Sequence, residues 1–158
     1  MAIILALAAA ALSGTGDFFG GLASRTDRVL SIVLINHVSG LLVVLAIGPF
    51  FEGSLDGPTL LWGSLAGLSG AFAVVALYTG FARSSIAVVS PIAAVGGGLW
   101  PAVWDIAGGD LPTPVVGAGI VLGLIAIWVI SSGGHLSEAE DVRSGVLFGI
   151  LAGLGFGA

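Results

Sequence analysis

Long apolar runs, separated by short polar breaks, make up most of this chain. Because the hydrocarbon core of a bilayer is about 30 Å thick, one helical crossing requires about 20 mostly apolar residues. The runs are too long for barrel strands and show no alternation of apolar and polar positions, so helices must satisfy their backbone hydrogen bonds. The pattern predicts an all-α fold, a polytopic transmembrane helix bundle. Five runs are long enough to cross: residues 3–22, 30–51, 60–82, 85–104 and 113–130.

A sixth apolar run, residues 145–158, is too short for a full crossing by the same measure. We therefore expect five full membrane helices and a truncated sixth. The segment before the sixth run is the longest polar stretch, and it suggests three parts of the chain. These are a five-helix repeat (1–131), a polar inter-repeat linker (132–143) and the truncated first helix of a second repeat (144–158). The sequence leaves open whether the truncation is natural.

Composition indicates that lipid, rather than water, surrounds most of the chain. Hydrophobic residues make up 57% of the 158 residues and charged residues 8%, and the mean hydropathy is +1.16. Soluble domains carry about 25% charged residues, a much larger share than in this chain. The net charge of −5 argues against a nucleic-acid partner, because such a partner requires basic surface to neutralise its phosphates.

Motifs for catalysis and metal binding are missing from the sequence. The chain has no cysteine and only two histidines, and it lacks HExxH, GxSxG and a phosphate-binding glycine loop followed by lysine. We therefore expect no enzymatic activity, no metal and no cofactor.

Polar residues inside the apolar runs are the first candidates for function, because each is costly in hydrocarbon unless it has a partner or a wet cavity. Asp17 lies in the first run, and Asn36 and His37 lie in the second. If the two helices form a hairpin with its midpoint near Asp27, positions 17 and 37 lie at similar depth. Asp17 and His37 would then share or relay a proton, or bind a polar solute. One alternative is a structural hydrogen bond between the two helices, and another is that Asp17 lies near enough to the interface to reach water.

The fourth run carries the next irregularity. Pro91 and Pro101 each remove a backbone donor, and three glycines at positions 96–98 lie between them. Bent or broken helices at membrane depth line cavities in transporters. The alternative is a simple kink that improves packing.

Three further side chains belong to the same hypothesis. Tyr78 and Ser90 are equidistant from a turn near Ser84 and would add polar contacts to such a cavity. Trp100 would stack on a solute, although core packing also explains it. The candidates for a solute pathway are then Asp17, Asn36, His37, Tyr78, Ser90, Pro91 and Trp100.

Glycine pairs spaced by four residues recur along the chain and favour close approach of helices. We interpret them as packing positions rather than ligand sites. They are Gly16/Gly20, Gly63/Gly67, Gly119/Gly123 and the series Gly145/Gly149/Gly153/Gly157.

Three segments together resemble the EamA-type transporters of the drug/metabolite transporter superfamily. They are LSGTGDFFGGLASR (12–25), ALYTGFARSSIAVVSPIAAVG (76–96) and GGDLPTPVVGAGIVLGLIAIWVI (108–130). The resemblance implies a ten-helix carrier of two inverted five-helix halves in the cell (inner or plasma) membrane. Such a carrier exports small metabolites or drugs by alternating access. Its solute path would run between helices 1 to 4 and their counterparts in a missing C-terminal half or a second copy.

The functional prediction is therefore a secondary-active transporter whose partners are a small-molecule solute and membrane lipid. Proton coupling through Asp17 is a hypothesis within it. The alternative is a non-transporting membrane scaffold or assembly protein. The sequence leaves open the substrate, the coupling ion, the direction of transport and the oligomeric state. It also leaves open the orientation in the membrane. All four arginines lie in odd-numbered loops, and the positive-inside rule then places the N-terminus outside. The arrangement of the family places the N-terminus inside.

Overall fold

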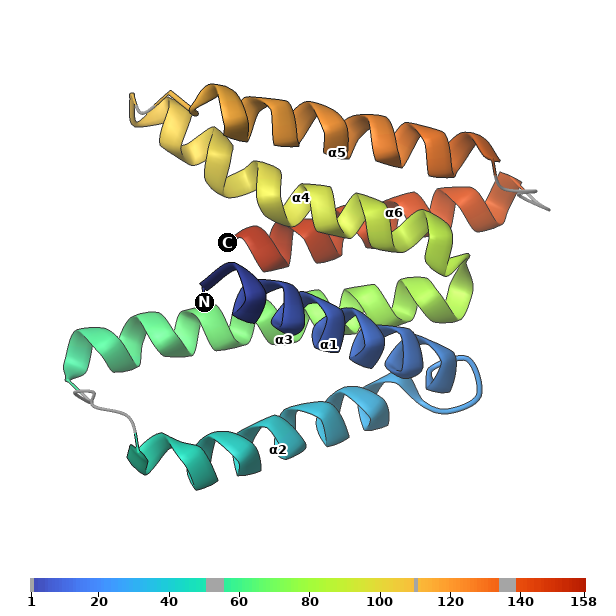
Figure 1. Ribbon diagram of the computed structural model, residues 1–158. Coiled ribbons are helices and arrows are strands. Elements are labelled where there is room, and N and C mark those ends of the chain that lie inside the picture. Colours follow the sequence, from blue (N-terminus) through green and yellow to red (C-terminus); the bar gives the residue numbers. More distant parts are fainter. Residues whose placement is uncertain (1, 51–55, 110, 134–138) are drawn as a thin grey trace.

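The computed structural model describes residues 2–50, 56–109, 111–133 and 139–158 (Figure 1). Within these ranges the regular structure is entirely helical, which confirms the predicted all-α class. The elements are α1 (Ala2–Ala23), α2 (Val29–Ile47), the single 3₁₀ turn η1 (Gly48–Phe50), α3 (Gly57–Arg83), α4 (Ile86–Ala107), α5 (Pro114–Gly133) and α6 (Ala139–Gly157).

Four of these helices are long and apolar enough to cross a membrane. The spans are Ile3–Ala23, Val29–Phe50, Gly57–Arg83 and Ile86–Ala107. The apolar stretches described in α5 and α6, Pro114–Ala126 and Val142–Gly157, are shorter. The chain thus has the helical build of a multi-pass membrane protein, and the count of five full crossings and a truncated sixth stays a prediction.

Two element boundaries differ from those expected. The α-helix of the second run ends at Ile47, and a 3₁₀ turn follows, because Pro49 has no N–H to continue the α-helical hydrogen bonds. Helix α6 begins at Ala139, so residues 139–143 of the predicted linker are helical. The apolar run marks only the part of a helix suited to lipid, whereas backbone hydrogen bonding continues beyond it. Positions 134–138 of the predicted linker lie outside the described residues.

Helix α6 lies between α3 and α4 and packs along both (Figure 1). Helix α5 packs on α4, while α1 and α2 pack on α3. The residues assigned to a second repeat are therefore integrated in the same bundle as the first five helices. A hydrogen bond of 2.7 Å from Ser69 Oγ on α3 to the carbonyl oxygen of Gly155 reinforces this placement.

The glycine series of α6 explains how closely α4 and α6 approach each other. A methyl group at Gly153 would lie 2.9 Å from the Cα of Gly96, and one at Gly149 would lie 2.9 Å from Ile92 Cβ. A methyl group at Gly145 would likewise meet Ser84 and Val88, and one at Gly157 would meet Trp100. The packing interpretation is thus confirmed for this series.

Other four-spaced glycines behave differently. A methyl group at Gly63 or Gly67 on α3 would meet nothing within 4 Å, so these two positions are not packing positions in this chain. Four-residue spacing alone marks one helix face and does not tell whether another helix covers it.

The buried core is concentrated near the turn between α3 and α4. Its largest fully buried side chains are Phe81 on α3 and Val89 on α4. The rings of Tyr78 and Phe81 stack with their centroids 6.1 Å apart. Helix α2 contributes the buried Val33 to this core, Val29 and Ile32 pack against the core partly buried, and most of its other apolar side chains are exposed to the surroundings of the bundle. Such a surface suits lipid.

Candidate functional site

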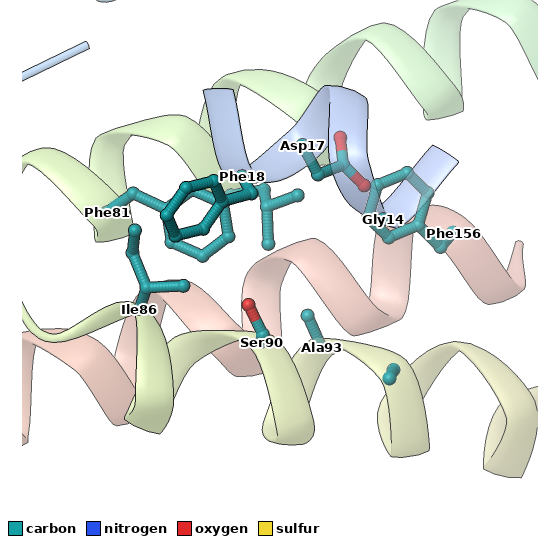
Figure 2. A pocket seen from close by; sticks show the side chains of 10 residues that line it. Gly14, Asp17, Phe18, Phe81, Ile86, Ser90, Ala93 and Phe156 are labelled. Atoms are coloured by element: carbon teal, nitrogen blue, oxygen red, sulfur yellow. The ribbon is translucent and has the colours of Figure 1, made fainter. Parts of the chain in front are cut away.

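A cavity of about 420 Å³ lies among α1, α3, α4 and α6 (Figure 2). Asp17 reaches it from α1, and Ser90 reaches it from α4 on the opposite side. Most of the remaining wall is apolar. The lining residues are Gly14, Asp17, Phe18, Leu77, Phe81, Ile86, Ser90, Ala93, Ala94 and Phe156.

The carboxylate of Asp17 is partly buried and has a partner on another helix. Tyr78 Oη donates a hydrogen bond of 3.3 Å to Asp17 Oδ1. Asp17 lies six residues before the end of α1, which is about 9 Å along the helix at 1.5 Å per residue. An acidic group at this depth is expensive in hydrocarbon, and the tyrosine hydroxyl and the cavity offset that cost.

Two adjacent glycines bring α1 close enough to α3 for this hydrogen bond. A methyl group at Gly20 would collide with the ring of Tyr78, and one at Gly21 would collide with the ring of Phe81. The sequence GTGDFFGG therefore combines the acidic residue with the small residues that allow α1 to lie against two aromatic side chains.

The end of α1 is fixed to the end of α3 by polar contacts. Ser24 Oγ donates to the carbonyl oxygen of Tyr78 at 3.3 Å, and Arg25 Nε donates to that of Phe81 at 3.1 Å. The carbonyl of Phe81 lies in the last turn of α3 and has no partner inside the helix, so a side-chain donor from the neighbouring segment satisfies it. These contacts fix the depth at which Asp17 faces the cavity.

Aromatic and aliphatic side chains surround the two polar groups. Figure 2 shows Phe18 and Phe81 at one end of the cavity and Phe156 beside Asp17. None of the lining residues is Arg, Lys or His. A solute that enters therefore meets one carboxylate, one hydroxyl and three phenyl rings. This chemistry suits an apolar body that carries a polar or cationic group.

The structure brings three of the predicted pathway residues together. Asp17 and Ser90 line the cavity, and Tyr78 lies behind Asp17 as its hydrogen-bond donor. The hypothesised pair of Asp17 with His37 is replaced by the pair of Asp17 with Tyr78. His37 Nδ1 instead lies 2.9 Å from the carbonyl oxygen of Val33 in its own helix.

The other candidates lie away from this cavity. Asn36 and His37 are exposed on α2. Pro91 and Pro101 lie inside α4, which is one helix over its whole length, and neither lines the cavity. Trp100 is 43% exposed, and its Cβ lies beside Gly157 near the end of α6.

Sequence reasoning missed the aromatic wall. Phe18 directly follows Asp17, so the sequence already showed that an aromatic residue is next to the carboxylate. Phe81 and Phe156 were not identifiable, because their role depends on α3 and α6 lying side by side. Among the described residues no group of three or more His, Asp or Glu side chains is placed to hold a metal ion.

In comparisons with known proteins, no family model, no curated protein and no solved structure matches this chain.

Proposed function

We propose that this chain is part of a secondary-active membrane transporter. The observation that carries the proposal is a cavity of about 420 Å³ inside a membrane-type bundle, with the partly buried carboxylate of Asp17 in its wall. Intramembrane acidic residues that face a cavity are characteristic of solute and proton pathways. The resemblance of the three sequence segments to EamA-type carriers supports the same function.

The proposed transporter exports small metabolites or drugs across the cell (inner or plasma) membrane by alternating access. Asp17 binds the polar or cationic group of the solute or a proton, but not both at once. Exchange of a solute for a proton then follows from competition for one carboxylate. A further helical half or a second copy completes the pathway.

The alternative function, a membrane scaffold, is less well supported. A scaffold requires neither a cavity nor an acidic side chain in its wall, and deleting both would stabilise it. Burial of Asp17 against an apolar wall is costly, and this cost is understandable where the carboxylate has a binding role.

Water access to the cavity is testable because the chain has no native cysteine. Ser90→Cys places a thiol in the cavity wall, and Leu42→Cys places one on the exposed apolar surface of α2. Thiols react as thiolates, which form in water and not in hydrocarbon. We expect a water-soluble maleimide to label Ser90→Cys in liposomes much faster than Leu42→Cys. Equal, slow labelling of both would favour the scaffold.

Transport itself is tested in proteoliposomes with ethidium as an apolar, aromatic, cationic probe. We expect a pH gradient to drive ethidium movement with the unmodified protein and not with Asp17→Asn. The matched control is Asp105→Asn, because Asp105 is exposed near the end of α4 and does not line the cavity. Unchanged movement in Asp17→Asn would exclude Asp17 as the coupling residue.

A further inference from the structure

A second cavity, an open surface depression of about 460 Å³, lies at the end of the bundle where α1 and α3 end and α4 begins. It is lined by Arg25, Phe81, Ala82, Arg83, Ser84 and Ser85. Two guanidinium groups and two serines make its character opposite to that of the apolar cavity around Asp17. The transport proposal assigns it no role.

Contacts within the protein hold both arginines in place. Arg25 Nε and Nη2 donate to the carbonyl oxygens of Phe81 and Ser84, at 3.1 and 3.3 Å. This leaves Nη1 of Arg25 available to a ligand. The guanidinium carbon of Arg83 lies 5.4 Å from the ring centroid of Phe148 on α6, a cation–π contact.

In the part of the chain that the structure describes, neither arginine at this opening is neutralised by a direct ion pair with a carboxylate, although Asp27 lies in the same turn as Arg25. Each of the two guanidinium groups that line this opening presents a planar fork of N–H donors, which matches the oxygens of a phosphate.

The location of the cavity selects the source of that phosphate. Arg28 at the start of α2 and Arg143 in α6 lie at the same end of the bundle as Arg25 and Arg83 (Figure 1). Helices that span a bilayer end at the level of the lipid headgroups, and loops rich in arginine face the leaflet that carries anionic lipid.

An apolar surface continues from this cavity along α1. Phe18 precedes Leu22 by four residues, so both side chains lie on one face of α1, and Arg25 follows in the turn after the helix ends at Ala23. Leu22 is 50% exposed, and Phe18, which also borders the cavity around Asp17, is 51% exposed. A headgroup at Arg25 would therefore place an acyl chain against this face. A free phosphate ion would make no use of it.

We propose that Arg25 and Arg83 form a binding site for the headgroup phosphate of an anionic phospholipid. Arg25 Nη1 and the guanidinium of Arg83 donate to the phosphate oxygens, and the acyl chain lies along Leu22 and Phe18. The site binds lipid whether or not the chain transports a solute. It also fixes the end of α1, and hence Asp17, relative to the headgroup layer.

Native mass spectrometry of the detergent-solubilised full chain tests the site with dioleoylphosphatidylglycerol and dioleoylphosphatidylcholine as probes. We expect the anionic lipid to be retained in preference to the zwitterionic one. Arg83→Gln should weaken retention of the anionic lipid by about tenfold, as expected for loss of a hydrogen-bonded charge. Arg28→Gln is the matched control, since it removes the same charge from the same end outside the cavity, and it should leave retention within about twofold of the unmodified protein.

Arg25→Gln is the second variant. If Arg25→Gln does not fold, the result for Arg83→Gln decides the test, because Arg83, unlike Arg25, makes no hydrogen bond to the carbonyls at the end of α3 in the described structure. Equal retention of both lipids would overturn the proposal. So would an equal loss in Arg28→Gln and Arg83→Gln, which would indicate unspecific attraction to the basic end. Displacement of the lipid by millimolar inorganic phosphate would assign the site to free phosphate and overturn the proposal of a lipid site.

Discussion

The hydroxyl of Tyr78 on α3 donates a hydrogen bond of 3.3 Å to Oδ1 of Asp17 on α1. Tyr78 is almost completely buried, whereas Asp17 keeps part of its surface toward the cavity. The tyrosine therefore positions the carboxylate, and the rest of the carboxylate remains available to a solute.

Tyr78→Phe should lower the free energy of unfolding by about 0.5 to 1.5 kcal/mol, because it removes this hydrogen bond and keeps the ring. Ethidium movement should be slowed and not abolished, since Asp17 remains in the cavity wall. A double-mutant cycle of Tyr78→Phe with Asp17→Asn measures the coupling, which should be about 1 kcal/mol. Strictly additive effects of the two substitutions would mean that the contact has no energetic weight.

Gly153→Ala should destabilise the bundle by about 1 to 3 kcal/mol, because the added methyl group would lie 2.9 Å from Gly96 Cα, a backbone atom that cannot move aside. Gly67→Ala is the control, since its methyl group would meet nothing within 4 Å. It should be neutral or stabilising by about 0.5 to 1 kcal/mol, the usual gain of Ala over Gly inside a helix. Unfolding of both variants in mixed detergent micelles gives the comparison. Equal stabilities would contradict the close contact of α4 and α6.

Phe81→Ala should cost about 3 to 5 kcal/mol, because Phe81 is 1% exposed and fills the space between α1 and the core. The same substitution at Phe72 of α3, which is 53% exposed, should cost about 0.5 kcal/mol or less. Denaturant unfolding of the two variants distinguishes a packed core from a uniformly lipid-facing helix. A similar cost at both positions would contradict the core described here.

Asp56 caps the first turn of α3 and makes its stability depend on pH. Hydrogen bonds from Thr59, its side chain first and then its backbone N–H, hold the pKa of Asp56 below its usual value. A carboxyl whose folded-state pKa is lowered contributes stability that is fully present above the unfolded pKa of about 3.9 and is lost as the pH falls through the folded pKa.

Amide exchange at Thr59, corrected for its intrinsic rate, should therefore show constant protection above about pH 5 and reduced protection below about pH 4. Asp56→Asn keeps a capping oxygen without a titrating group, so its protection should not change over this range. A loss of protection at low pH that is the same in Asp56→Asn would assign the effect to another group.

Particular residues illustrate how far sequence reasoning reached. Asp17 was identified because a polar side chain in a long apolar run is costly, and this argument needs no neighbour. Ser90 and Tyr78 were identified because they are equidistant from the turn near Ser84, which places them at similar depth. The partner of Asp17 was not identified, because equal distance from a turn places Asp17 and His37 at one depth without fixing which way either helix face points. The same limit applies to Gly63 and Gly67, whose spacing matches that of the α6 series although no helix covers them.

The sequence by itself determined the helical class and the approximate helix ends, because the cost of unpaired backbone groups in hydrocarbon acts on each apolar run separately. It also determined that an acidic group lies inside the first run. Only the tertiary structure decided that α6 packs between α3 and α4, that Tyr78 meets Asp17, and that Phe81 and Phe156 complete one cavity. Those contacts join residues far apart in the chain, and they depend on how the helices rotate and approach, which the steric fit of facing side chains determines.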